Sequence, residues 1–179
     1  RGYADAERLL LFADLHGHSR RHNIFAYGCE ASKSALRGAE RVFPRLLADC
    51  PHFSLPGCSY KVMKSKESTG RVVVWRQFAL PHSFTIEASF CGARLPSCGD
   101  AAQGGGGGGG SSSGVHFHTG HLRDMGAAIV PALVALTDPA QMRVHAILAG
   151  MAAGAEADAA AAAAALQGGG DGDEATDGK

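Results

Sequence analysis

Two low-complexity stretches decide how much of this 179-residue chain can fold. Residues 99–114 read GDAAQGGGGGGGSSSG, which is the composition of a flexible linker. After Met151 the chain is mostly alanine, glycine and acidic residues, and Leu166 is its one large apolar side chain. Such a segment cannot bury a core, so residues 151–179 are expected to form a disordered tail. Residues 1–98 and 115–150 must therefore supply one hydrophobic core, which suits a single domain.

Charge divides the chain in a similar way. The 17 basic residues balance the 17 acidic ones, but residues 156–179 hold six of the acids and only Lys179 among the bases. The rest of the chain is therefore basic, with 16 bases and 11 acids. Overall neutrality and the absence of a nucleic-acid-binding motif argue against a nucleic-acid partner. The basic body nevertheless permits an acidic one.

Other bulk features narrow the class of protein. No run of about 18 apolar residues occurs, so neither a membrane span nor a membrane partner is expected. The five cysteines include no C-x-x-C pair, which favours free thiols in a reducing compartment. The sequence begins at Arg1 without a leader segment, so we expect it to be a piece of a longer chain.

Hydrophobic patterning predicts an α/β domain. The apolar run LLLFADLH at 9–16 is typical of a buried strand that ends in polar residues, and SFTIEASF at 83–90 alternates like a second strand. Apolar residues recur at helical spacing over 119–136, although Pro131 interrupts that pattern. Further strands are expected at 53–62, with a break at Pro56-Gly57, and at 71–78, and a further helix at 32–41. Strands and helices intermix, which indicates the α/β class.

The densest polar cluster follows the first predicted strand. On extended chain, residues two apart share a face, so Asp14, His16 and His18 would point the same way. Two imidazoles beside a carboxylate are suitable zinc ligands, with the carboxylate orienting a histidine. Solvated or hydrogen-bonded loop histidines would explain the same pattern equally well.

Glu87 is the second candidate because it lies among apolar and small residues in SFTIEASF. A carboxylate in that setting must be paired, bound to a metal, or desolvated, and a desolvated one is a natural general base or acid. The alternative is a structural ion pair with Arg71 or Arg76. The basic stretch from Lys61 to Arg76 could likewise attract an acidic substrate or form a solvated loop.

Four blocks in order, DLHGHSRRHNIFAYG, FPRLL, KSKESTGRVVVWR and SFTIEASFCG, resemble the cytosolic carboxypeptidases. These are the branch of zinc metallocarboxypeptidases that trims glutamates from protein tails. The likeness covers about residues 8–98, and VHFHTGHLRDMG resembles the closing helix of that family. The resemblance implies an α/β/α fold with a mixed central sheet, of which this chain holds the C-terminal portion.

The resemblance also implies roles for single residues. His16 matches the third zinc ligand, Glu87 matches the general base and acid, and Arg71 lies near the base of a pocket for an acidic side chain. His18 matches a position that lines the cleft. The implied cofactor is zinc, the implied partners are glutamylated protein tails such as those of tubulin, and the implied location is the cytoplasm, at microtubules or cilia.

One departure from the family bears on activity. The upstream His-x-x-Glu zinc pair does not occur in this sequence, so the fragment alone is expected to be inactive. An inactive module that binds acidic tails is therefore a second interpretation. A metal-dependent phosphoesterase with an N-terminal Asp-Leu-His-x-His motif is a third, but aspartates are scarce downstream, where Asp49 is the only one between 15 and 98.

Overall fold

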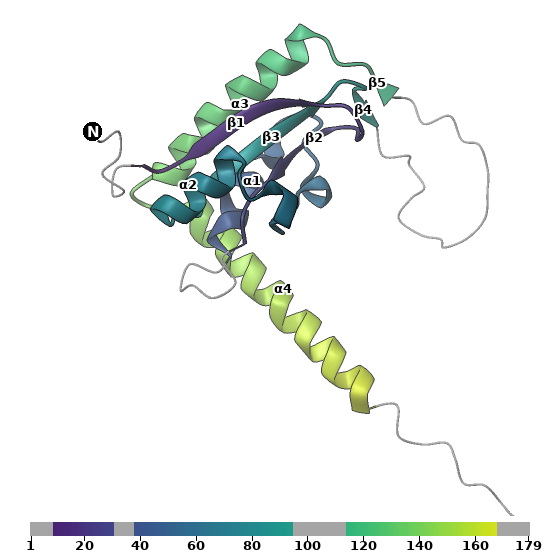
Figure 1. Cartoon of the computed structure of the whole chain (residues 1–179). Coiled ribbons are helices and arrows are strands. Elements are labelled where there is room, and N and C mark those ends of the chain that lie inside the picture. The colour runs from purple at the N-terminus through teal and green to yellow at the C-terminus, as the bar shows by residue number, and fades with distance from the viewer. Residues whose placement is uncertain (1–8, 31–37, 95–113, 168–179) are drawn as a thin grey trace, which may run out of the picture.

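A three-stranded sheet organises the domain, in the order β1-β3-β2. The computed structural model describes residues 9–30, 38–94 and 114–167. Strand β1 (Phe12–His18) runs parallel to β3 (Ser83–Ser89), whereas β2 (Ile24–Tyr27) runs antiparallel to β3 on its other side. The short strands β4 (Ala93–Arg94) and β5 (Gly114–Val115) form a separate ladder (Figure 1). A mixed sheet with flanking helices confirms the predicted α/β class.

Helices cover both faces of the sheet. The core face of β3 and β2 packs against α1 (Val42–Leu46) and α3 (Thr119–Thr137). Helix α2 (Gly70–Phe78) contacts β1 and β3 from the other side, where the backbone oxygen of Arg71 accepts a 2.7 Å hydrogen bond from Ser83. Every residue of β3 is buried as a result. The buried apolar residues shared by these elements are Ile24, Ala26, Val42, Phe43, Leu46, Phe84, Ile86, Ala88, Met125, Ala132 and Leu136.

The strand predicted at 71–78 is wrong, because this segment forms helix α2. Its β-branched run favours a strand by intrinsic preference, but that preference is weak and tertiary packing overrides it. Thr69 is extended and begins the helix, and Ala79 ends it in the left-handed conformation at φ 49°. Only Arg71 and Val72 of α2 are buried. Burial of so few residues is typical of a short helix on the surface, whereas most residues of a central strand are buried.

The interruption predicted at Pro56-Gly57 within 53–62 is confirmed, but the flanking residues form isolated bridges rather than a strand. Ser54 caps a short 3-10 helix (Leu55–Gly57) by accepting the Gly57 amide at 3.1 Å, and Pro56 has no amide to give a ladder. Isolated bridges from Phe53 to Ile24 and from Ser59 to Tyr27 are what remains of the pairing. Three more 3-10 helices occupy Ala39–Arg41, Leu47–Asp49 and Lys64–Lys66.

The helix predicted at 32–41 lies largely outside the described residues. The described part continues from the 3-10 turn at Ala39–Arg41 into α1. Pro44 lies inside the first turn of α1, where its missing amide costs no hydrogen bond. The helix predicted at 119–136 is confirmed as α3, with Pro131 inside it.

Helix α4 (Met142–Gln167) differs from the expected disordered tail. Its first turns pack on α1 and α3, and the helix then extends away from the sheet (Figure 1). Residues 152–161 of this helix are all exposed, so they pack against no core. Alanine has the highest helix propensity, which explains why this segment is nevertheless helical. The other low-complexity residues, 99–113 and 168–179, fall outside the described part.

No single helix among the described residues is long and apolar enough to cross a membrane. Helices α3 and α4 meet that test of length and composition only together, as a pair bent by 86°.

Candidate functional site

The parallel pairing of β1 and β3 brings the predicted metal ligand beside the predicted base. In the register of the two strands His16 is opposite Glu87, and His18 is opposite Ser89. Residues opposite each other on neighbouring strands present their side chains on the same face of the sheet. Both residues lie toward the carboxyl ends of their strands, where α/β sheets commonly place their ligands.

His16 has the environment of a metal-ligating histidine. Its Nε2 lies 2.9 Å from Oδ1 of Asp14, two residues earlier on the same face of β1, and 56% of its side chain is exposed. A carboxylate on one ring nitrogen fixes the orientation of the ring and leaves Nδ1 as the nitrogen for an external ligand. The predicted carboxylate–histidine arrangement is thus present.

Glu87 is buried, with 8% of the residue exposed. The imidazole of His18 lies beside it, with Nδ1 3.7 Å from Oε2, too far for a hydrogen bond. Oε2 is buried and has no hydrogen-bond partner within the described part of the chain. The alternative of a structural pair with Arg76 does not hold, because Arg76 pairs with Glu67 at 3.2 Å.

Aromatic rings of β2 continue the site on the same face. Phe25 is opposite Glu87 in the antiparallel register, and Tyr27 is opposite Thr85. The His18 ring packs edge-on against both, with centroid distances of 5.0 Å to Phe25 and 6.4 Å to Tyr27. Neither aromatic is among the residues predicted for the site, although their spacing of two in a short apolar segment is a usable signal for a shared face.

Arg71 extends this face toward α2. It is 6% exposed at the start of the helix, and its guanidinium lies over the Tyr27 ring at 5.6 Å. Its Nε donates to the Gly28 carbonyl at 3.4 Å and Nη1 to the Thr69 hydroxyl at 3.4 Å. Within the described ranges it forms no ion pair with a carboxylate. A buried guanidinium with only neutral partners is suited to an acidic ligand.

The donor set for zinc is partial. Catalytic zinc takes three protein ligands, and the residues that the structure describes contain no cluster of three or more metal-ligating side chains. His16 therefore fits one zinc ligand, and the His-x-x-Glu pair expected to supply the other two does not occur in this sequence. Another histidine pair, His118 and His121, is occupied in capping the amino end of α3.

Comparison with solved structures identifies the fold. A metallo-carboxypeptidase from Burkholderia cenocepacia aligns with a TM-score of 0.52 at 19% identity, over 72% of this chain and 30% of that one. The sheet and its helices therefore have the fold of a metallocarboxypeptidase.

No family model matches the chain, but sequence comparison with known proteins identifies its relatives. Mouse cytosolic carboxypeptidase 3 is 39% identical over 150 residues, 80% of this chain, and human cytosolic carboxypeptidase 2 is 37% identical over 147 residues, 81% of this chain. Zebrafish cytosolic carboxypeptidase 1 is 34% identical over 76% of this chain. The chain is thus a homologue of the cytosolic carboxypeptidases, as its motifs predicted, and it spans 13%, 15% and 12% of the length of these three relatives.

Proposed function

We propose that this chain is the part of a zinc metallocarboxypeptidase that carries the general base, one zinc ligand and the specificity pocket. The observation that supports this most directly is the pairing of His16 with Glu87, whose buried carboxylate oxygen has no hydrogen-bond partner in the described residues. Structural carboxylates in protein interiors are normally paired, so an unpartnered one is a candidate for chemistry.

Each residue has a distinct role in the proposed reaction. Zinc, held by His16 and two ligands from outside this chain, would supply a Lewis acid and lower the pKa of a bound water. Glu87 takes the proton of the attacking water at Oε2 and later delivers it to the leaving amine. Asp14 holds the His16 ring in place through the 2.9 Å contact. His18 lines the cleft beside the base.

The substrate in this proposal is an acidic protein tail, with tubulin as the example. Arg71 would bind the side-chain carboxylate of a glutamate, because its buried charge lacks an acidic partner in the described ranges. We place the protein in the cytoplasm, since its relatives are named cytosolic carboxypeptidases. Association with microtubules or cilia follows from the choice of substrate.

Replacement of the base tests the catalytic proposal. In the longer chain that supplies the other two ligands, Glu87→Gln should lower glutamate release from a polyglutamate-tailed peptide by about 10²–10⁴-fold, the usual worth of a general base. Bound zinc, measured by metal analysis, should stay unchanged, and a chelator should abolish the wild-type activity. Glu67→Gln, an exposed carboxylate paired with Arg76, is the matched control. Near-wild-type release by Glu87→Gln would remove Glu87 from the mechanism.

A binding module without catalysis is the second candidate, favoured by the missing His-x-x-Glu pair. In that case, the longer chain would bind a polyglutamate peptide equally well with and without chelator and would release no glutamate. The same assay therefore separates the two functions.

A further inference from the structure

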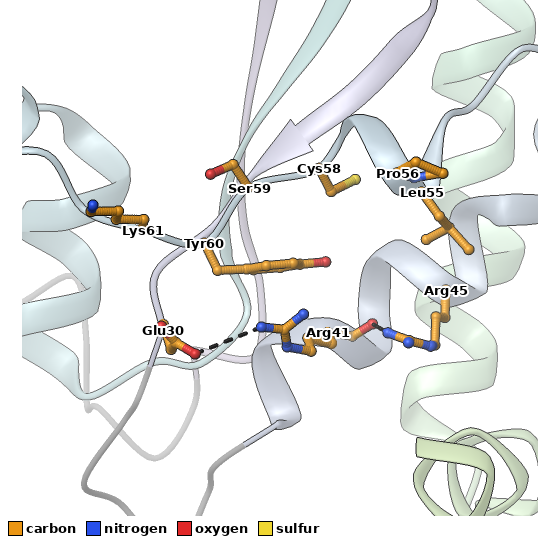
Figure 2. Close-up of a pocket in the computed structure, with 9 residues that line it drawn as sticks. All are labelled: Glu30, Arg41, Arg45, Leu55, Pro56, Cys58, Ser59, Tyr60 and Lys61. Atoms are coloured by element: carbon orange, nitrogen blue, oxygen red, sulfur yellow. Dashed lines mark hydrogen bonds and ion pairs between the residues drawn. The ribbon is translucent and has the colours of Figure 1, made fainter. Parts of the chain in front are cut away.

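A second basic cleft lies on the opposite side of β2 from the candidate site. It encloses about 460 Å³ between α1 and the segment at 58–61, with Glu30 at one end (Figure 2). Strand β2 runs antiparallel to β3, so the chain beyond Tyr27 leads away from Glu87. The Tyr60 ring contacts Gly28 and belongs to the core face with Phe84, whereas Arg71 lies over Tyr27 on the other face. The cleft is therefore separate from the residues of the proposed mechanism.

One arginine of this cleft is fixed by its neighbours. The guanidinium of Arg41 lies 3.6 Å from a carboxylate oxygen of Glu30 and 3.6 Å from one of Glu40, which is 1% exposed. The same guanidinium stacks over the Tyr60 ring at 4.7 Å. Arg41 is thus held with one flat face against an aromatic ring, an arrangement that orients the remaining N–H groups.

Arg45 lies one turn later on the same face of the helix. Its Nη1 contacts the Arg41 carbonyl at 3.5 Å, and within the described ranges it has no carboxylate partner. The charge of Arg41 is balanced by Glu30 and Glu40, so Arg45 is the guanidinium of this cleft that is left without a carboxylate in the described ranges. Lys61, which also lines the cleft, adds to the positive field although its ammonium points away from Arg45 (Figure 2).

Tyr60 supplies a neutral donor between the two arginines. Its hydroxyl end reaches across the cleft toward α1, above the guanidinium groups (Figure 2). A tyrosine phenol keeps its proton at neutral pH and can donate to an anion, and burial raises the pKa of this one further. Two guanidinium groups and a phenol form a donor set that matches an oxyanion in shape and charge.

We propose that this cleft is an anion-binding site in which Arg45, Arg41 and Tyr60 hold a carboxylate or phosphate group of a ligand. The site is independent of the proposed hydrolysis, because none of its residues lies on the His16–Glu87 face. A glutamate-rich segment and free phosphate are the two sources of such a group.

Isothermal titration of the full chain tests the site with two probes, hexaglutamate and inorganic phosphate. Removing one charge-assisted contact by Arg45→Gln should weaken binding by about tenfold or more, and salt should weaken wild-type binding. Arg123→Gln removes an exposed guanidinium from α3 and is the matched control, with unchanged affinity expected. Tyr60→Phe keeps the ring under Arg41 and should also weaken binding, so the test does not depend on one variant folding.

The outcomes distinguish a glutamate-rich segment from free phosphate as the ligand, and they distinguish the anion-binding site from the catalytic proposal. Binding of hexaglutamate alone identifies a carboxylate ligand, and binding of phosphate alone identifies a phosphate ligand. Absence of binding by either probe, or equal losses in Arg45→Gln and Arg123→Gln, would overturn the site. Glu67→Gln, an exposed carboxylate outside both this cleft and the proposed mechanism, should bind both probes like the wild type. Phosphate binding involves no peptide hydrolysis, so a failure of the catalytic proposal leaves that result unaffected.

Discussion

At the scale of single residues, burial decides which titratable groups can act. Glu87 and His82 are both removed from water near β3, but they differ in what surrounds them. Glu87 faces His18 and the candidate site, whereas the Nδ1 of His82 is buried without a hydrogen-bond partner in the described residues. The His82 ring stacks near Phe84 and contributes packing. Glu87 is therefore the candidate for chemistry, whereas His82 bears on stability.

His82 should make the stability of the chain depend on pH. Burial lowers its pKa from 6.5 to about 4, so the folded state holds the neutral ring while the unfolded state protonates more readily. Stability is then complete above about pH 6.5 and is lost as the pH falls toward 4, by an amount on the order of 3 kcal/mol. Urea unfolding at pH 7 and pH 4.5 measures this loss. His82→Phe should reduce it and exposed His145→Phe should not; equal pH dependence in all three chains would contradict the assignment.

At the scale of elements, packing rather than local preference decides the secondary structure. The segment at 71–78 has the β-branched composition of a strand and forms α2, because a helix there covers the edge of the β1–β3 pair. The alanine-rich end of α4 shows the opposite case, in which propensity alone produces helix. Its buried positions stop early, with Val144 at 9% exposed and residues 152–161 fully on the surface.

Truncation should separate these two contributions. Ending the chain after Gly154 removes the end of α4, of which residues 155–161 are all exposed, and should change the free energy of unfolding by about 0.5 kcal/mol or less. Leu136→Ala, in the buried face of α3, should cost about 2–5 kcal/mol through the cavity it leaves. Urea unfolding compares both with the full chain. A truncation as costly as Leu136→Ala would mean that the exposed helix makes contacts essential to the fold.

At the scale of the whole molecule, the candidate site lacks part of the ligand set that a catalytic zinc needs. In the proposed mechanism the described residues supply one zinc ligand and the base, whereas catalytic zinc takes three protein ligands. The length of the relatives agrees with this, because the chain spans 13% of mouse cytosolic carboxypeptidase 3.

Metal titration of the chain should show this incompleteness. Cobalt(II), followed by its visible absorption, should bind weakly to the chain alone and much more tightly once the missing ligands are supplied by the longer chain. His16→Ala should remove the tight site, and His145→Ala, on the exposed side of α4, should not. Tight binding by the short chain that survives His16→Ala would place the metal elsewhere.

The sequence by itself determined the strands at β1 and β3, helix α3 and the α/β class, and it singled out His16 and Glu87 as candidates for chemistry. Apolar runs and alternation depend on burial along one element, so they can be recognised locally, and His16 and Glu87 stand out within such runs. Only the tertiary structure decided that β1 and β3 pair in parallel and bring those two residues together. It also placed Phe25 and Tyr27 in the site and made 71–78 a helix. Strand register, the packing of a helix against a sheet and the pairing of buried charges are set by contacts between distant segments, which local patterns do not encode.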